Sequence, residues 1–368
     1  MSKPVTVGIV GCGAISAIYC KNLTETFSNV TVKTLADLDV ARAQARAEEF
    51  GIPGASTVDE LMADPEIQIV VNLTVPKAHY PVAMQAVEAG KSVIGEKPFT
   101  VTREEGRKLL AAAKAKGVLV GSAPDTFFGA GIQTARKLID DGFIGKPVSC
   151  TAFMQCHGHE TWHPSPEFYY EVGGGPMFDM GPYYLTALVN LLGPVARVTG
   201  SASKAYETRT ITSMPKKGKV IPVETPTHLA GVLDFATGCV GTIITSFDVF
   251  SAGLPNIQIH GTEGSLGVPD PNGFGGPVRL YRPEDGEWRD MPLTHRYKEN
   301  SRGIGVADMA AALQSGRAHR ANGELAFHVL DIMHAFEESS TGGVHITLES
   351  SCSRPAAMPT TLVHGSLD

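Results

Sequence analysis

The chain has 368 residues, 43% of them hydrophobic and 19% charged, which is long and apolar enough for two ordinary domains, each with its own core. The formal net charge is -7 and Lys and Arg form no basic run, so neither nucleic acid nor an anionic membrane is an expected partner. The six cysteines form no C-x-x-C pair, and no targeting segment or membrane span is found, which favours a cytoplasmic protein with free thiols and no metal site.

The first third of the sequence alternates between short apolar runs and helical segments. The runs predicted to be strands are 5–10, 30–36, 67–73, 92–95 and 118–120. The segments predicted to be helices are 16–23, 40–50, 78–89 and 103–116, the last of them after a capping box of Thr102 and Glu105. Repeated β-α units predict a doubly wound parallel sheet, and hence a Rossmann domain over residues 1–124.

The pattern changes near Pro124, where longer strands replace the β-α units. The predicted strands are 148–156, 195–203, 228–235, 239–247 and 256–260, and the predicted helices are 132–141, 176–192 and 324–338. Two of these strands form a hairpin around Gly238, and hairpins make antiparallel sheets. The stretches 214–226 and 267–277 are rich in Pro and Gly and are predicted to be loops. Residues 125–368 therefore form a second domain, of the α+β class.

A glycine-rich loop follows the first strand, with Gly11 and Gly13 ahead of a predicted helix. Glycines at this place let backbone N–H groups approach a pyrophosphate, which the helix dipole also favours. Ser16 stands at the third glycine position and is small enough for close packing. The loop is predicted to bind a dinucleotide through Gly11, Gly13, Ala14 and Ile15.

Asp37 ends the second predicted strand, where an acid accepts the ribose hydroxyls of NAD and repels the 2′-phosphate of NADP. The next residue is Leu38, and no arginine stands beside Asp37 to hold that phosphate. The sequence therefore favours NAD over NADP, with Asp37 and Leu38 at the adenosine end. A tight turn and a surface aspartate without any nucleotide are the alternative.

Several motifs follow one another over nearly the whole chain: Pro76, His79, Gly95-Glu96-Lys97-Pro98, Asp141-Gly142-Phe143-Ile144-Gly145, Gly173-Gly174-Gly175, Asp179, Gly181, Tyr183 and His260-Gly261-Thr262-Glu263-Gly264. In this order they resemble the Gfo/Idh/MocA family, named for glucose-fructose oxidoreductase and inositol dehydrogenase. The resemblance implies a Rossmann domain, and a substrate-binding and oligomerisation domain built on an open, mostly antiparallel sheet. It also implies an active site between the two domains, a homodimer or homotetramer, and further cofactor contacts at Thr74, Pro76, His79, Glu96 and Lys97.

Lys97 lies beyond the carboxyl end of a parallel strand, where doubly wound folds place their ligands. An ammonium there can donate to a substrate oxygen next to the nicotinamide. Desolvation and the cationic ring are both expected to lower the pKa of Lys97. The alternative is an exposed lysine before a proline turn.

Asp179 and Tyr183 lie four residues apart on the helix predicted over 176–192, and hence on one face. Many members of the family have histidine at the position of Tyr183, and others have tyrosine. A phenol is a base near neutral pH only if a cation lowers its pKa, so Lys97 and Tyr183 are expected to share the acid and base work. Asp179 is expected to orient the substrate hydroxyl or the lysine. Aromatic packing remains the alternative for Tyr183.

His159-Glu160-Thr161-Trp162-His163 matches the H-E-x-x-H pattern of zinc proteases, but Pro164 disfavours the helix which that pattern needs. We expect this loop to line the substrate pocket instead, through His157, His159, Trp162, His163 and Tyr169. The alternative is a loop that covers the sheet or makes a subunit contact. Asp125 is the last expected substrate contact. It stands in Pro124-Asp125-Thr126-Phe127, where the family commonly has an Arg-Phe pair, and the missing arginine favours neutral, hydroxyl-rich substrates.

These residues predict an NAD-dependent dehydrogenase that oxidises a ring hydroxyl of a neutral sugar, sugar derivative or cyclitol. A glycoside-cleaving enzyme of the same family, in which NAD transiently oxidises the sugar before an elimination, would retain both the loop and Lys97. A non-catalytic NAD-binding regulator would tolerate the loss of the lysine, so the presence of Lys97 argues against it.

Overall fold

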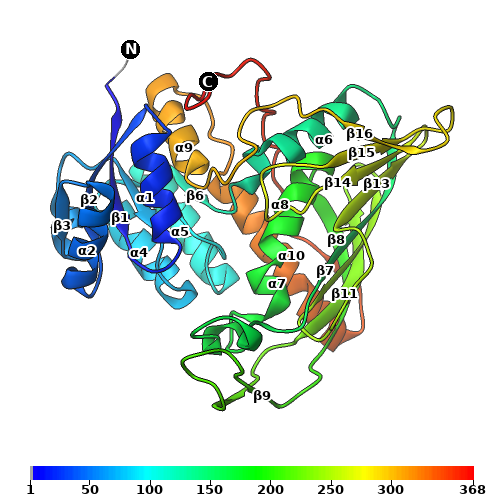
Figure 1. The fold of residues 1–368 in the computed structure, drawn as a ribbon, viewed down its shortest axis with the longest axis horizontal. Coiled ribbons are helices and arrows are strands. Elements are labelled where there is room, and N and C mark those ends of the chain that lie inside the picture. Colours follow the sequence, from blue (N-terminus) through cyan, green and yellow to red (C-terminus); the bar gives the residue numbers. More distant parts are fainter. Residues whose placement is uncertain (1–2) are drawn as a thin grey trace.

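The computed structural model describes residues 3–368 and contains two large sheets, with helices between and around them, and one small two-stranded sheet (Figure 1). The N-terminal sheet is wholly parallel, with the strand order β3-β2-β1-β4-β5-β6. Its strands are β1 (Val5–Val10), β2 (Val30–Ala36), β3 (Gly54–Ser56), β4 (Ile69–Asn72), β5 (Ser92–Gly95) and β6 (Val120–Ser122). Its helices are α1 (Ser16–Glu25), α2 (Val40–Phe50), α3 (Val58–Ala63), α4 (Pro76–Glu88) and α5 (Arg103–Lys116). The predicted Rossmann fold is confirmed.

Local sequence explains most of these boundaries. The predicted capping box of Thr102 and Glu105 begins α5, and Gly117, in the left-handed conformation, ends it. Thr57 and Glu60 form a second capping box at α3, a helix that the sequence interpretation did not include. Strands β1, β2 and β5 have the predicted ranges, and β4 and β6 differ from theirs by one or two residues at their ends. The short β3 was not predicted.

The C-terminal sheet is mixed and mostly antiparallel, as predicted, with the order β16-β15-β14-β13-β7-β12-β11-β8-β17 and one parallel pair, β7 with β12. Its central strands are β7 (Pro147–Gln155), β8 (Val195–Ser203), β11 (His228–Phe235), β12 (Val240–Ser246) and β13 (Ile257–Gly261). Its outer strands are β14 (Ser265–Val268), β15 (Val278–Tyr281), β16 (Trp288–Met291) and β17 (Ile346–Thr347). Figure 1 shows α6 (Ala130–Asp140), α8 (Gly181–Leu192) and α10 (Gly323–Gly342) between this sheet and the Rossmann sheet.

Three expectations about this half of the chain are wrong. The single helix predicted over 176–192 is two helices, α7 (Gly175–Asp179) and α8, because the backbone breaks at Met180. The predicted loop 214–226 contains β10 (Val220–Pro222), which pairs with β9 (Thr208–Thr210) in a separate two-stranded sheet. The predicted loop 267–277 begins inside β14, where Gly267 faces Arg279 in the ladder.

A late segment of the chain packs against the Rossmann domain. Helix α9 (Ile304–Ser315) lies beside β4, and the side chain of Asn29 donates to Ala307 O over 2.8 Å. The amide of Asn22 on α1 donates to the carbonyl oxygens of Asn300 and Arg302, at 2.9 and 2.8 Å. The domain boundary at residue 124 stays a prediction, and residues far beyond it complete the N-terminal half.

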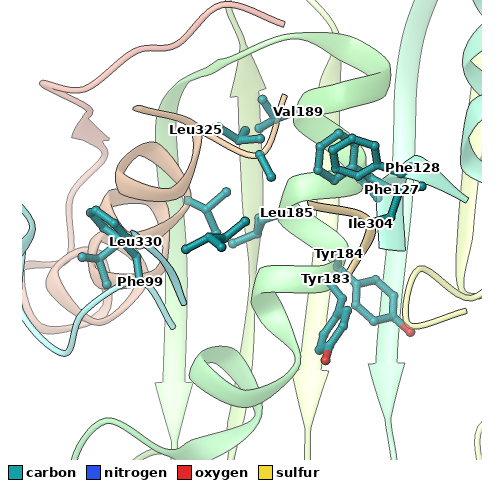
Figure 2. Packing of buried hydrophobic residues seen from close by; sticks show 14 of the residues in the cluster. Phe99, Phe127, Phe128, Tyr183, Tyr184, Leu185, Val189, Ile304, Leu325 and Leu330 are labelled. Atoms are coloured by element: carbon teal, nitrogen blue, oxygen red, sulfur yellow. The ribbon is translucent and has the colours of Figure 1, made fainter. Parts of the chain in front are cut away.

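A buried apolar cluster joins the two halves. Figure 2 shows rings and aliphatic side chains from Phe99, Phe127, Phe128, Leu185, Val189, Ile304, Leu325 and Leu330 in this cluster. Tyr183 and Tyr184 lie at its edge, and their hydroxyls point away from it in the figure. The apolar residues of α10, which covers the predicted helix 324–338, are buried as part of the same core. In the described part of the chain, no helix is long and apolar enough to cross a membrane.

Candidate active site

The predicted cofactor residues come together at one edge of the Rossmann sheet. They follow β1, β2, β4 and β5, which are consecutive neighbours in the sheet, and parallel strands place their carboxyl ends at the same edge. The loop Gly11 to Ile15 follows β1, Asp37 and Leu38 follow β2, Thr74, Pro76 and His79 follow β4, and Glu96 and Lys97 follow β5. The order in which strands are added to the sheet reverses between β1 and β4. Doubly wound folds bind their ligands at this point.

The glycine-rich loop fits a dinucleotide. Gly11 has a φ of 99°, and a Cβ there would lie 2.7 Å from the backbone of Leu73, so only glycine suits this position. A Cβ on Gly13 would meet no described atom within 4 Å, so the outer side of the loop can be approached closely. Ser16 is buried and its Oγ donates to Gly13 O over 2.7 Å. No described side chain caps α1, which leaves its first N–H groups available to a pyrophosphate.

Asp37 faces this loop from the end of β2. Its Oδ2 accepts a hydrogen bond from the Cys12 N–H over 2.8 Å, and its Oδ1 accepts one from the Asp39 N–H over 3.0 Å. The Nη1 atom of Arg42 lies 3.6 Å from Asp37 Oδ1. The expectation that no arginine stands near this acid is therefore wrong, because Arg42 reaches back from the first turn of α2. The adjacent Leu38 side chain is fully exposed.

Replacing Asp37 by alanine is expected to shift the nucleotide preference. In the wild type, NAD should raise the melting temperature more than NADP does, because the carboxylate repels a 2′-phosphate. Without it, the Arg42 guanidinium can pair with that phosphate, so NADP should gain about tenfold or more in affinity relative to NAD. Thermal melting over a titration of each nucleotide measures the change, and Asp39→Ser is the control. Equal stabilisation of the wild type by both nucleotides would contradict the assignment.

His79 is buried and joins two loops of this edge. Its Nδ1 lies 2.6 Å from Pro98 O and its Nε2 lies 3.0 Å from Thr74 O. Its backbone carbonyl accepts from the Asn72 amide over 3.0 Å, and that amide's oxygen accepts from the Thr74 hydroxyl over 2.6 Å. Both ring nitrogens are thus occupied by protein atoms. His79 therefore supports the backbone around Thr74 and Lys97, and its predicted direct contact with the cofactor remains a prediction.

Glu96 connects Lys97 to α1. Its Oε1 accepts from the hydroxyl of Tyr19 over 2.8 Å, and its Oε2 accepts from the Lys97 N–H over 3.1 Å. Burial, together with the neighbouring Glu96 carboxylate, raises the pKa of Tyr19 well above its usual value, so the phenol keeps its proton. Tyr19 was not identified from the sequence, because nothing in its helix distinguishes it from a core tyrosine.

Lys97 forms a buried ion pair with Asp179. Lys97 Nζ lies 2.6 Å from Asp179 Oδ1, and Asp179 Oδ2 lies 2.9 Å from Nε2 of His159. Burial acts to lower the pKa of Lys97, but Asp179, Tyr183 and Glu96 together outweigh it and raise that pKa. Burial acts to raise the pKa of Asp179, but Lys97 and His159 outweigh it and lower that pKa to about 2. The expected lowering of the Lys97 pKa is wrong for the protein alone, because these three neighbours compensate the desolvation.

Tyr183 lies beside this pair, with Lys97 Nζ 5.5 Å from the centre of its ring. Burial raises the pKa of Tyr183, and the opposing charge of Lys97 does not offset this. The expectation that a cation makes Tyr183 a base near neutral pH is therefore wrong. The phenol also lies close to the guanidinium of Arg302, which is bonded to Asn272 and Asn300. The sequence interpretation found no arginine in the segment around Asp125, where the family commonly has one. Arg302 brings a cation to the site from another part of the chain.

Asp125 is directed away from this cluster. Its Oδ2 accepts from the N–H groups of Gly303 and Gly305, at 2.8 and 3.1 Å, so it holds the N-terminus of α9. Burial raises the pKa of Asp125 to about 6. Its prediction as a substrate contact is not supported, because the carboxylate is occupied by backbone groups. The segment that carries Gly303 lies far away in the sequence, so the partner could not be recognised.

The loop after β7 brings only part of the predicted substrate wall into the cluster. His159 contacts Asp179, whereas the His157 ring stacks on Phe250 with centroids 3.9 Å apart. His163 Nδ1 accepts from the Ser165 N–H over 3.0 Å, and Trp162 is 61% exposed. Within residues 3–368, no group of three or more His, Cys, Asp or Glu side chains could hold a metal ion.

Glu160, the residue after His159, belongs to a buried network of charged side chains. Its Oε1 accepts from Arg209 Nη1 over 2.9 Å, and both side chains are only 5% exposed. Arg209 also pairs with Asp248, and the hydroxyl of Tyr170 donates to Glu160. The partners come from β9 and from the end of β12, so local sequence patterns carried no signal for them.

Two family models match the chain in the expected order. The description "Oxidoreductase family, NAD-binding Rossmann fold" applies to residues 5–123, and "GFO/IDH/MocA C-terminal domain" to residues 132–267. The first match confirms NAD as the cofactor of the N-terminal domain.

The relatives are dehydrogenases and reductases. A scyllo-inositol 2-dehydrogenase (NADP+) of Bacillus subtilis is 25% identical over 94% of this chain and 96% of its own length. An inositol 2-dehydrogenase/D-chiro-inositol 3-dehydrogenase of Lactiplantibacillus plantarum is 32% identical over 39% of this chain and 41% of its own length. The structure of levoglucosan dehydrogenase with NADH has the same fold, with a TM-score of 0.82 at 21% identity, over 95% of this chain and 100% of that one. This protein is therefore an enzyme, and its chain belongs to the GFO/IDH/MocA family of oxidoreductases.

Proposed function

We propose that the protein is an NAD-dependent dehydrogenase that oxidises a ring hydroxyl of a sugar, sugar derivative or cyclitol. The observation that carries this proposal is the Lys97–Asp179 ion pair at the carboxyl edge of the Rossmann sheet, next to Tyr183. An amine and a phenol at this edge, where a doubly wound fold binds its ligands, support a proton exchange with the substrate hydroxyl. The names of the similar proteins, which act on inositols and on levoglucosan, support this substrate class.

The side chains of the site divide the work on the substrate oxygen. NAD, when bound, accepts the hydride that leaves the substrate carbon. As the carbonyl forms, the hydroxyl proton passes to Lys97 Nζ. The amine must first lose its own proton, which the surrounding charges hold tightly, so oxidation is favoured at high pH. The resulting ammonium stays paired with Asp179. In the reverse direction the same ammonium returns the proton to the oxygen. Tyr183 keeps its proton, because burial raises its pKa, and its phenol orients the substrate oxygen as a hydrogen-bond donor.

Arg302 widens the substrate class that must be tested. The inference of a neutral substrate depended on a missing arginine near Asp125, whereas Arg302 brings a guanidinium to Tyr183 from elsewhere in the chain. Guanidinium groups bind carboxylates and phosphates strongly. A panel that tests the proposal therefore pairs each neutral sugar and cyclitol with its carboxylated counterpart.

Purified protein is expected to form NADH on at least one neutral member of this panel. The absorbance of NADH measures the rate of the reaction, and mass spectrometry identifies the carbonyl product. Activity on carboxylated members alone would contradict the neutral substrate and assign Arg302 to the carboxylate. Release of an aglycone without net NADH formation would contradict the dehydrogenase altogether.

A further inference from the structure

Asp179 is bonded on both of its oxygens, and the second partner has no part in the proton transfer described above. Oδ1 accepts from Lys97 Nζ over 2.6 Å, and Oδ2 faces His159 Nε2 over 2.9 Å. The side chains of Lys97, Asp179 and His159 are 17%, 11% and 9% exposed, respectively. In such an enclosed place, a hydrogen bond to a carboxylate changes the charge that its other partner feels.

The surroundings of His159 determine which nitrogen carries its proton. Asp179 is ionised and accepts only, so Nε2 is the donor. The other nitrogen, Nδ1, is buried and has no partner in residues 3–368. The rings of Trp162, Tyr169 and Phe247 surround the imidazole, with centroids 5.2, 4.3 and 4.5 Å away. An unpaired N–H is costly to bury there, so the hydrogen of the ring belongs on Nε2, where Asp179 accepts it.

The position of His159 is built by residues that touch neither the cofactor nor the substrate. The next residue, Glu160, is held by Arg209, and its carbonyl accepts from the Thr212 and Ser213 N–H groups at 2.9 and 3.1 Å. Gly158 has a φ of 36°, and a Cβ there would lie 2.0 Å from Glu160 Oε2, so glycine is required for the carboxylate to fold back. The sheet of β9 and β10 therefore fixes the turn that carries His159.

We propose that His159 is a positioning residue for the reaction: its Nε2–H holds Oδ2 of Asp179, shares the carboxylate charge with Lys97 and thereby sets the pH at which Lys97 releases its proton. This inference rests on the proposed dehydrogenase function. Removing the Nε2–H concentrates the charge of Asp179 on Lys97 and makes the ammonium hold its proton more tightly. Oxidation requires neutral Lys97, so the rate rises with pH, and the rise moves to higher pH when His159 is lost.

Other charged and titratable groups face the same chain, and they stay in place in the variants below. Glu96 and Tyr183 face Lys97 from β5 and α8. Cys156 and Tyr169 face Asp179 from the loop after β7, and His163 faces His159 from the same loop. If His159→Leu and His159→Gln moved the alkaline rise in rate by the same amount, the cause would be one of these other groups and not the hydrogen-bond donor at residue 159.

Comparing His159→Leu with His159→Gln separates the loss of the hydrogen-bond donor from the change of packing at residue 159. Glutamine keeps an N–H for Asp179 but cannot titrate, whereas leucine has no donor. We expect the leucine variant to lose about 10- to 100-fold in kcat, with the alkaline rise of kcat moved up by about 0.5–1 pH unit. The glutamine variant should regain most of the rate and return the rise to its wild-type position. The exposed His345→Gln is the control, and melting with NAD verifies the folding of each variant.

Acetic anhydride labelling of Lys97 at a fixed pH, read by mass spectrometry, tests the same coupling without catalysis. Below its pKa an amine reacts in proportion to its neutral fraction, so the labelling rate of Lys97, relative to that of the exposed Lys108, should fall by about 3- to 10-fold in His159→Leu and return in His159→Gln. An unchanged labelling rate in the leucine variant, or the same loss of kcat in both variants, would overturn the proposal. If the wild type oxidises no member of the panel while the labelling rates change as expected, the proposed function fails and the coupling between His159 and Lys97 stands.

Discussion

Replacing Lys97 by alanine is expected to lower the rate of NADH formation by about 10²–10⁴-fold, the usual contribution of a general acid or base. The amine accepts the hydroxyl proton, and neither of its neighbours can replace it. Asp179 is a weak base because its pKa is lowered to about 2, and Tyr183 keeps its proton because burial raises its pKa. Steady-state kinetics on a substrate from the panel measure the loss, with kcat falling more than KM rises.

A double variant separates catalysis from the burial of charge. Lys97→Ala alone leaves Asp179 as a buried carboxylate without its ammonium, which should lower the melting temperature. Adding Asp179→Asn removes that charge and should restore the melting temperature but not the activity. Lys108→Ala, at an exposed pair with Glu104, is the matched control and should change neither. A Lys97→Ala protein that keeps more than about a tenth of the wild-type rate would remove Lys97 from the mechanism.

Arg209→Met is expected to be the most destabilising of the substitutions considered, by about 3–5 kcal/mol. Arg209 and Glu160 are each 5% exposed, and Asp248 is 13% exposed, so removing the guanidinium leaves two carboxylates enclosed without a cation. Breaking a buried pair costs far more than breaking an exposed one, because the remaining charge cannot be hydrated. Chemical denaturation with fluorescence detection measures the shift of the midpoint.

Arg197→Met is the matched comparison. Arg197 pairs with Asp234 over 2.6 Å but is 48% exposed, so its loss should cost no more than about 1 kcal/mol. Restoring neutrality with Glu160→Gln and Asp248→Asn in the Arg209→Met background should recover part of the stability. Equal stability of Arg209→Met and Arg197→Met would contradict this prediction, because water would then have to hydrate the carboxylates of Glu160 and Asp248.

Features that depend on neighbouring residues could be predicted from the sequence. The strand before Gly11, the acid at Asp37 and the capping box at Thr102 each depend on a few adjacent positions, and the structure has them at the expected places. Lys97 and Asp179 were recognisable through motifs, and the structure brings them to 2.6 Å from each other. The carboxyl edge of a parallel sheet is also predictable, because it follows from strand order.

Features that depend on distant segments could not be predicted. Asp125 accepts a hydrogen bond from the Gly303 N–H, and Arg209 forms an ion pair with Glu160. No local sequence pattern connects the members of either pair. The shift of the Lys97 pKa is opposite in direction to the expected one, because the fold sets how closely Asp179, Tyr183 and Glu96 surround the ammonium. The H-E-x-x-H segment forms a short 3-10 turn instead of an α-helix, as its prolines indicated, but the contact between His159 and Asp179 required the fold itself.

The packing of α9 against β4 has a consequence for the order in which the protein matures. During synthesis the six parallel strands leave the ribosome first, whereas the helix that covers them arrives only with residues 304–315. Until then the apolar surface beneath α9 stays open to water, and Asp125 has no helix N-terminus to bind. The nucleotide-binding half therefore reaches its final form after most of the substrate half has been translated, although it stands first in the chain.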